Sequence, residues 1–422
     1  MHIADARVTP IAFKDPPLLN VAGVHEPFAL RSIIEVETDD GRIGLGETYG
    51  DLDTLAALET CRTVLPGLAV HDLNGLHGRV REALAGAITT KRAADAPYTP
   101  QSGRQVATAF GAFEVALLDL QAQNAQIPLH ALLGGAVRDR IPYSAYLFYK
   151  FARHHGDPGY PADDWGEAIN HAQVVEQTRR MVRDYGFGSI KLKAGVFEPD
   201  FEVETLRQIQ KAFPDHPLRI DPNGGWSVPT TLRLLPQLDG VLEYLEDPTG
   251  TLAEMGEVAR HASMPLATNM VTTEFAHIPE TLRLGAVQVV LSDHHYWGGL
   301  RATQHLAHLA GVFGLGISMH SNSHLGISLA AMTHVAATVP NLDYACDTHY
   351  PWQIEEVIDG GKLRFTGGAL PLPAGPGLGV KLDRTALAAL HKSYLDCGLR
   401  RRDDASEMRK HSPSWNGARP RF

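Results

Sequence analysis

Short apolar runs alternate with amphipathic stretches throughout the second half of the chain. After position 138, each apolar run is followed by a segment in which hydrophobic residues return at helical spacing, as in 167–185 and 300–313. This alternation is typical of parallel strands connected by helices. We expect strands at 142–147, 189–193, 218–221, 244–246, 265–269, 287–291, 315–320 and 344–347.

Eight strands of this kind predict an α/β fold of the (β/α) barrel class, in which catalytic residues gather at the carboxyl ends of the strands. A doubly wound open sheet is the alternative that the same pattern allows. Strands joined by right-handed crossovers are parallel, so their carboxyl ends lie on one face of the sheet. Side chains at these ends are therefore the first candidates for a functional site.

The first part of the chain has a different pattern. Residues 3–10 and 30–48 form strand-like runs, and Asp39-Asp40-Gly41 is typical of a hairpin turn, which together predict a small antiparallel sheet. Helical spacing dominates from about 52 to 135, most clearly at 106–123. We therefore expect an α+β domain ahead of the barrel.

The boundary between the two domains is expected just after Gly134-Gly135, where the helical pattern ends. We place the α+β domain at 1–137 and the barrel at 138–374. The stretch from 367 to 380 is rich in Gly and Pro, which predicts a turn-rich return to the first domain. Residues from about 375 to 422 would then complete that domain.

Composition narrows the class of protein. The chain has 422 residues, 44% of them hydrophobic and 20% charged, and no apolar run approaches the roughly 18 residues of a membrane span. A net charge of −10 disfavours a nucleic-acid partner. Three scattered cysteines predict neither a disulfide framework nor a Cys-x-x-Cys metal site. The sequence starts Met1-His2-Ile3-Ala4-Asp5, without a secretory signal, so we expect a cytoplasmic protein.

Three neighbouring strands of the predicted barrel end in oxygen donors. Asp221, Glu246 and Asn269 each close an apolar run, and they are spaced as one strand, one loop and one helix require. Two carboxylates and an amide oxygen form a site for a hard cation. Mg²⁺ suits so few protein ligands, because it leaves positions open for substrate.

Two lysines end the strand that precedes these three. Lys191 and Lys193 are alternate residues and therefore share one face of the strand. Neighbouring ammonium groups and a nearby cation lower a lysine pKa, which makes such a lysine a usable general base. The alternative is a pair of surface lysines at a strand end.

A second acid/base pair is expected on the opposite wall of the barrel. Asp293 and His320 follow neighbouring strands. A carboxylate at one strand end can accept a hydrogen bond from an imidazole at the next and so fix the tautomer of the imidazole. His294, His295 and His324 lie close by in the sequence, and His320 and His324 have the spacing of some zinc ligands. The alternative is that these three histidines are polar loop or helix-cap residues.

Motifs for serine hydrolases, P-loop kinases and dinucleotide binding are absent from the sequence. What remains is a cation site flanked by a lysine and a histidine. A cation bound to a carboxylate stabilises the charge that develops when the weakly acidic α-proton is removed. With an acid/base group on each face, either configuration at the α-carbon can react, and a β-hydroxyl can be protonated as it leaves.

Several motifs together carry a resemblance to a known family. They are Lys191-Leu192-Lys193, Asp221-Pro222-Asn223-Gly224, Glu246-Asp247-Pro248, Ala267-Thr268-Asn269-Met270, Asp293 with His295 and Trp297, His320-Ser321-Asn322 and Asp347-Thr348-His349. The chain resembles the enolase superfamily in its mandelate racemase-like branch, and within that branch the D-glucarate dehydratases. Asn269, in place of a third acidic metal ligand, is a feature of these dehydratases.

The resemblance implies a modified (β/α)₇β TIM barrel with an N-terminal α+β capping domain. It implies that Asp221, Glu246 and Asn269 bind Mg²⁺, that Lys193 and the His320–Asp293 dyad are the acid/base catalysts, and that Lys191 lies beside the substrate carboxylate. The substrate contacts that it implies are His25, Tyr146, Asn223, Asn322, His349 and Arg402, the last of which would pair with the distal carboxylate of a diacid.

The resemblance also implies a reaction, the dehydration of D-glucarate to 5-dehydro-4-deoxy-D-glucarate. Dehydration or epimerisation of galactarate or another acid sugar is the nearest alternative. A family member that binds without catalysis is a second one. The expected partners are an acid-sugar substrate and further copies of the chain, with no nucleic acid and no membrane.

Overall fold

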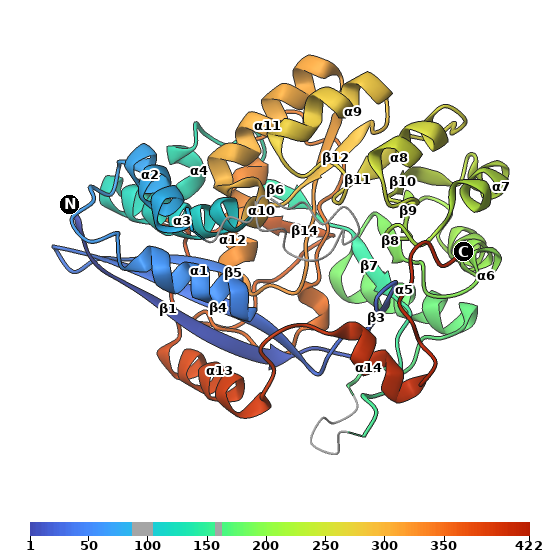
Figure 1. The fold of residues 1–422 in the computed structure, drawn as a ribbon, viewed down its shortest axis with the longest axis horizontal. Coiled ribbons are helices and arrows are strands. Elements are labelled where there is room, and N and C mark those ends of the chain that lie inside the picture. The colour runs from blue at the N-terminus through green and yellow to red at the C-terminus, as the bar shows by residue number, and fades with distance from the viewer. Residues whose placement is uncertain (87–103, 157–162) are drawn as a thin grey trace.

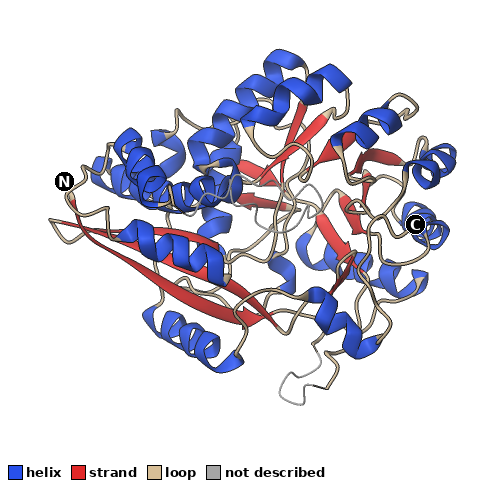
Figure 2. Cartoon of the chain, in the orientation of Figure 1, coloured by secondary structure: helices blue, strands red, loops and turns tan. Residues whose placement is uncertain are grey.

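The computed structural model describes residues 1–86, 104–156 and 163–422, and the two largest sheets of these residues are of different kinds (Figures 1 and 2). The N-terminal sheet is antiparallel, in the order β1-β4-β5, with bounds Ile3–Lys14, Phe28–Thr38 and Ile43–Tyr49. Gly41 has a φ of +81° and its amide donates to the Thr38 carbonyl, which forms the predicted hairpin turn between β4 and β5. A short hairpin, β2 (Leu19–Asn20) with β3 (Gly23–Val24), lies in the loop between β1 and β4.

Four helices follow the N-terminal sheet: α1 (Leu52–Arg62), α2 (Leu73–Ala83), α3 (Arg104–Ala125) and α4 (Leu129–Leu132). The middle of α3 is buried on all sides, as its apolar composition predicts. One side of α3 approaches β5, where a Cβ on Gly44 would lie 2.1 Å from the Ala116 carbonyl oxygen. The other side packs against α10 (His294–Trp297) and α11 (Gly299–Phe313). This helix therefore joins the N-terminal sheet to the second half of the molecule.

The second sheet has seven parallel strands in the order β13-β12-β11-β10-β9-β8-β7. From β7 to β13 their bounds are Ala145–Phe148, Ile190–Lys193, Leu218–Asp221, Leu242–Glu246, Leu266–Thr268, Val289–Ser292 and Gly316–Met319. The helices between and after them are α5 (His171–Tyr185), α6 (Pro199–Ala212), α7 (Val228–Leu238), α8 (Leu252–Ala259), α9 (Ile278–Leu284), the pair α10 and α11, and α12 (Gly326–Ala337). Every strand residue of β8 and β9 is buried, as expected of a parallel sheet that is covered by helices.

The expected eighth strand at 344–347 is not a regular strand. The Cys346 amide donates to the Pro142 carbonyl, the Ser144 amide donates to the Cys346 carbonyl, and the Asp347 amide donates to the Met319 carbonyl, each at 2.9 Å. These isolated bonds link the segment to both edges of the curled sheet without forming a ladder. The first barrel strand also starts at Ala145, because β6 (Arg140–Pro142) pairs antiparallel with β14 (Ala369–Pro371). The fold is thus the modified TIM barrel with an N-terminal cap that the sequence predicted.

The C-terminal part of the chain returns to the N-terminal part. The Leu129 amide at the start of α4 donates to the Gly377 carbonyl at 2.8 Å. Helix α13 (Arg384–Cys397) packs against β1, and α14 (Asp404–His411) packs against β3 (Figure 1). No helix in the described ranges is long and apolar enough to cross a membrane.

Candidate active site

The three oxygen donors lie at the ends of adjacent strands. Asp221 is the last residue of β9, Glu246 is the last of β10, and Asn269 follows β11 directly. Both carboxylates are fully buried and Asn269 is 9% exposed. Its Oδ1 has no hydrogen-bond partner among the described residues, although its backbone amide donates to Asp247 Oδ2 at 2.9 Å. An unpaired amide oxygen beside two carboxylates has the donor set that Mg²⁺ requires.

Electrostatics at these strand ends favour a cation. Burial raises the pKa of Glu246 well above its ordinary value, and the neighbouring Asp221 carboxylate adds to the effect. Burial would also raise the pKa of Asp221, but the ammonium groups of Lys193 and Lys191 lower it below its ordinary value. A divalent cation between the two carboxylates would relieve their repulsion. The residues present therefore fit a magnesium ion.

Lys191 and Lys193 point to the same face of β8, as their spacing predicts, but their surroundings differ. Lys191 Nζ donates to Glu246 Oε1 and Asp347 Oδ2, both at 2.7 Å. Burial alone would lower the pKa of Lys191, but Asp347 and Glu246 raise it well above its ordinary value. Lys193 Nζ donates to Asp221 Oδ2 at 2.6 Å, and its pKa is lowered by burial and, despite Asp221, by the charge of Lys191. Lys193 is thus the lysine suited to give up a proton.

The opposite wall carries a histidine dyad. Asp293 follows β12 and His320 follows β13, and His320 Nδ1 lies 3.0 Å from Asp293 Oδ2. The sheet order places β9, β10, β11 and β12 between the strands of Lys193 and His320, so these two residues reach the same cavity from widely separated strands of the curled sheet. Burial would raise the pKa of Asp293, but His295 and His320 lower it well below its ordinary value. The carboxylate therefore stays charged beside His320.

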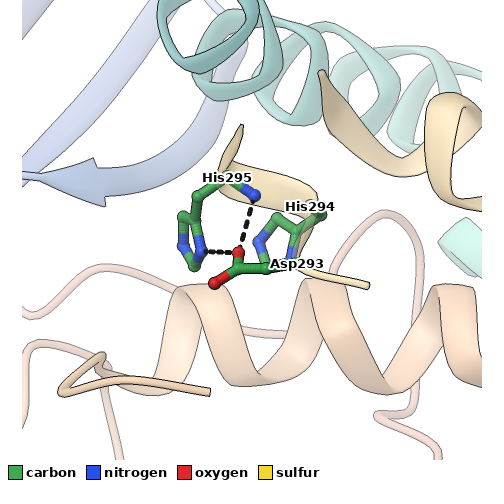
Figure 3. A group of neighbouring side chains, drawn as sticks. All are labelled: Asp293, His294 and His295. Carbon is green, nitrogen blue, oxygen red and sulfur yellow. Dashed lines mark hydrogen bonds and ion pairs between the residues drawn. The ribbon is translucent and has the colours of Figure 1, made fainter. Parts of the chain in front are cut away.

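Asp293, His294 and His295 also lie close enough together to suggest a second metal site (Figure 3). The Oδ1 of Asp293 already accepts from the His295 amide at 2.9 Å and lies 2.6 Å from His295 Nδ1. The other ring nitrogen of His295 lies 2.8 Å from Arg31 Nη2, whose positive charge would repel a metal cation. His324, the remaining candidate, has its Nε2 3.5 Å from Ser321 Oγ. We therefore interpret this group as a hydrogen-bonded network.

A cavity of about 550 Å³ opens above the strand ends. Lys191, Asp221, Glu246 and Asp293 are buried and do not line it, whereas the predicted site residues that line it are His25, Tyr146, Lys193, Asn223, Asn269, His320, Asn322, His349 and Arg402. The imidazoles of His25 and His349 stack with their centroids 6.2 Å apart, and His25 Nδ1 lies 2.9 Å from Asp15 Oδ2. Burial and the charges nearby lower the pKa of His349 well below its ordinary value, so its ring is neutral.

The remaining predicted substrate contacts differ in how they are held. Asn223 has a φ of +54° at the end of β9, a conformation that non-glycine residues adopt mainly at functional sites and turns. Asn322 donates to the Tyr49 hydroxyl at 2.7 Å. Arg402 forms a bidentate pair with Asp404 at 2.7 and 2.6 Å, so its Nε and Nη2 are already engaged. A diacid substrate would have to use the remaining nitrogen or replace this pair.

Sequence reasoning missed three residues that contact the site residues directly. Asp347 forms an ion pair with Lys191; it is the last residue of the expected eighth strand and belongs to one of the motifs of the resemblance, but the sequence indicates no role for it. Arg31 and Tyr49 come from β4 and β5 and reach Asp293 and its neighbours. A buried arginine inside an apolar strand, as at Leu30-Arg31-Ser32-Ile33, is a signal that could have identified Arg31.

Family models match most of the chain. Residues 173–386 match the enolase C-terminal domain-like family, and residues 8–134 match the N-terminal domain of the mandelate racemase / muconate lactonizing enzyme family. A probable glucarate dehydratase from Streptomyces coelicolor is 52% identical, over 98% of this chain and 97% of the relative. Muconate cycloisomerase 1 from Rhodococcus opacus is 27% identical over 77% of this chain and 78% of the relative.

Solved structures of similar proteins share the fold over its whole length. An enolase from Pseudomonas fluorescens, crystallised with magnesium, potassium and tartrate, is 53% identical with a TM-score of 0.97, over 100% of this chain and 99% of that chain. An enolase from Thermobispora bispora, in complex with magnesium and formate, is 51% identical with a TM-score of 0.96, over 100% of both chains.

Proposed function

The chain belongs to the enolase superfamily, and from this premise we propose that it is a Mg²⁺-dependent dehydratase of an acid sugar, with D-glucarate as its substrate. The observation that carries the proposal is the arrangement at the strand ends. Asn269 lines a cavity and Asp221 and Glu246 are buried at the neighbouring strand ends, with Lys193 on one wall of the cavity and the His320–Asp293 dyad on the other. The 52% identity to a probable glucarate dehydratase supports the choice of substrate.

We assign the metal to Asp221, Glu246 and Asn269. Bound Mg²⁺ would supply positive charge beside a substrate carboxylate and so make the neighbouring α-proton more acidic. Lys191, which remains charged between Asp347 and Glu246, would hold the same carboxylate by a charge-assisted hydrogen bond. This assignment explains why an unpaired amide oxygen is tolerated on Asn269.

The proposed reaction uses the two walls of the cavity. His320 takes the C5 proton of glucarate on Nε2, while Asp293 stabilises the imidazolium through Nδ1. The electron pair left at C5 expels the C4 hydroxyl, and the proton on His320 passes to that hydroxyl, so water leaves. Lys193 would act in the same way on the epimer with the opposite configuration at C5, L-idarate.

The remaining polar residues of the cavity would orient the substrate. We propose His25, Tyr146, Asn223, Asn322 and His349 as contacts to the hydroxyl groups and the proximal carboxylate, and Arg402 as the contact to the distal carboxylate. We also propose that the cap consists of 1–137 and about 375–422, and the barrel of 138–374. The bond between Leu129 and Gly377 supports this division.

The test is turnover on a panel of acid sugars. With Mg²⁺, the native protein should form a keto acid from D-glucarate, and the His320→Asn variant should be at least about a hundredfold slower. Galactarate and monoacid sugars should react more slowly, and Arg402→Met should impair only diacids. No product from glucarate, or an undiminished rate in His320→Asn, would refute the proposal.

A further inference from the structure

Arg31 connects the N-terminal sheet to the dyad on the barrel. It lies on β4, is 1% exposed, and places Nη2 2.8 Å from His295 Nε2. Its Nε donates to Glu47 Oε1 at 3.1 Å, and Glu47 in turn accepts from the Leu325 and Ser328 amides at 2.7 and 2.8 Å. The guanidinium is therefore fixed by the first turn of α12 as well as by β5.

This contact determines the tautomer of His295. A guanidinium cannot be deprotonated in a protein and is only a donor, so His295 Nε2 must be the acceptor. The proton of the neutral ring then lies on Nδ1, which donates to Asp293 Oδ1 at 2.6 Å. Ser328 Oγ, 2.8 Å from His295 Nε2, can donate to the same nitrogen and is consistent with this tautomer.

The tautomer of His295 in turn determines how Asp293 faces His320. Oδ1 of Asp293 accepts from both the amide and Nδ1 of His295, which leaves Oδ2 to accept from His320 Nδ1. His320 then carries its proton on Nδ1, and its Nε2 is the basic nitrogen available to the cavity. Arg31, His295, Asp293 and His320 thus form a chain of hydrogen bonds from β4 to the cavity.

We propose that Arg31 is a positioning residue for the acid/base histidine: by fixing the tautomer of His295 it orients Asp293 and keeps His320 Nε2 free to accept a proton. The proposal rests on the function proposed above for His320. It assigns a role in the reaction to the N-terminal sheet, whose Arg31 also lines the cavity and donates through Nη1 to Asn322 Oδ1 at 3.2 Å. His295 becomes a positioning residue through the same chain.

The charge of Arg31 has a second effect on His295. Burial lowers the pKa of His295, and Arg31 lowers it further, while the Asp293 carboxylate acts in the opposite direction. Without Arg31, the ring could take a second proton and pair with Asp293 as an imidazolium. Asp293 would then attract the proton of His320 less strongly, and the two rings would compete for one carboxylate.

Kinetics of variants in two backgrounds test the proposal. Arg31→Met should lower kcat on D-glucarate about tenfold to a hundredfold, as a misplaced catalytic group does, with KM changed less than about twofold. His295→Asn should also lower kcat, but less than Arg31→Met does, because its side-chain amide can still donate to Asp293 Oδ1. In the His295→Asn background, Arg31→Met should lower kcat only slightly further, since the effect of Arg31 on kcat passes through the imidazole of His295.

A purely structural role of Arg31 predicts a different result. Loss of its ion pair with Glu47 would lower kcat equally in the native and His295→Asn backgrounds, and that outcome would overturn the proposal. His334→Gln is the matched control, because His334 is a buried histidine of α12 that bonds to His130 and the Leu378 carbonyl, away from the dyad. It should lower stability and leave kcat near the native value.

A spectroscopic measurement decides the question without substrate. In protein labelled with ¹⁵N-histidine, the His295 signal, assigned by its loss in His295→Asn, should show a neutral ring protonated on Nδ1. In Arg31→Met it should change to an imidazolium or to the Nε2–H tautomer. An unchanged tautomer would overturn the proposal. Absence of turnover by the native protein would instead refute the proposed function. The ¹⁵N signal would still test whether Arg31 fixes the tautomer of His295.

Discussion

Lys191 and Lys193 lie two positions apart on one strand and have opposite electrostatic surroundings. Lys191 pairs with three buried carboxylates, those of Asp221, Glu246 and Asp347, whereas Lys193 pairs with Asp221 alone and lines the cavity. The alternation of residues along a strand predicts their shared face. It cannot predict which lysine has the raised pKa and which the lowered one, because the contact of Lys191 with Asp347 joins residues 156 positions apart.

The buried pairs of Lys191 should contribute strongly to stability. In Lys191→Met, Glu246 loses its ion-pair partner and Asp347 keeps only Arg219, 3.9 Å away, and removal of one partner of a buried pair costs about 3–5 kcal/mol. Urea denaturation in metal-free buffer measures the free energy of unfolding. Lys193→Met is the matched comparison. It should lower the free energy of unfolding clearly less, because Asp221, the partner of Lys193, still has Lys191 Nζ at 3.6 Å as a cation. Equal losses in the two variants would contradict this description of the pairs.

Residues of the site differ in how far the sequence could identify them. The sequence predicts the metal ligands, the lysines and the dyad because they lie at the ends of apolar runs. In a barrel, catalytic residues lie at the carboxyl ends of the strands. Arg402 is predicted to pair with the distal carboxylate of a diacid substrate, but Asp404, two positions later, already pairs with it. Arg31 contacts His295 across 264 positions, and only the packing of the cap on the barrel brings them together.

At the scale of elements, the close approach of α3 to α10 and α11 sets the position of the dyad. Gly111 allows this approach, because a Cβ there would lie 2.8 Å from the Gly299 amide nitrogen and 3.0 Å from the His294 carbonyl oxygen. Gly111→Ala should therefore shift α10, lower stability by about 1–3 kcal/mol and reduce kcat. Thermal denaturation and turnover measure the two effects.

Gly78 on α2 is the control for Gly111, because a Cβ there meets no atom within 4 Å. Gly78→Ala should leave kcat unchanged and stabilise the protein by about 0.5–1 kcal/mol, since alanine is the better helix former. If Gly111→Ala behaved like Gly78→Ala, the contact of α3 with α10 would not set the position of the dyad.

Helix α12 carries a pH-dependent contact with α4. His334 is fully buried, its Nε2 lies 3.2 Å from the Leu378 carbonyl oxygen, and its Nδ1 lies 3.1 Å from His130 Nδ1. Burial lowers the pKa of His334 to about 4 from its ordinary 6.5, so the unfolded chain binds a proton between these pH values that the folded protein does not. Stability should therefore fall as the pH decreases from 6.5 to 4, by about 3 kcal/mol from this residue.

The check is the free energy of unfolding of the native protein and of His334→Gln across this pH range. The variant cannot titrate at this position, so the difference between the two proteins should change with pH in favour of the variant as the pH falls. Two parallel stability curves would show that His334 does not make this contribution.

The elements that the sequence predicted best are the long, strongly periodic ones. Helix α3 and strands β8 to β13 lie where hydrophobic spacing placed them, because burial on one or both faces leaves a clear pattern. The prediction of an eighth strand was wrong, since Cys346 is buried but Tyr344 and Ala345 are only partly buried, and the backbone forms only isolated bonds to Pro142, Ser144 and Met319. An apolar run in the sequence does not by itself require a ladder of backbone hydrogen bonds.

At the scale of the whole molecule, the cavity is built by both parts of the chain. His25, Tyr49 and Arg402 reach it from the N-terminal and C-terminal segments, and Lys193 and His320 reach it from the barrel. The sequence predicts the two architectures separately, but the packing between them arises from buried pairs such as Glu114 with the Leu300 amide, 2.6 Å apart. Such long-range pairs have no local pattern.

Metal binding should stabilise the whole fold. Mg²⁺ at about a hundred times its Kd should raise the free energy of unfolding by about 2.7 kcal/mol, with a matching rise in Tm. Asn269→Leu should reduce this rise, because it removes one proposed ligand. Asn124→Ala, at the exposed end of α3, should respond to Mg²⁺ as the native protein does. An equal rise in native protein and Asn269→Leu would place the metal elsewhere.

The most direct test of two acid/base groups on opposite walls is α-proton exchange in D₂O with Mg²⁺, followed by NMR. His320→Asn should fail to exchange the C5 proton of D-glucarate and still exchange that of L-idarate, whereas Lys193→Met should show the reverse. If either variant lost or kept exchange with both epimers, Lys193 and His320 would not serve opposite faces of the substrate.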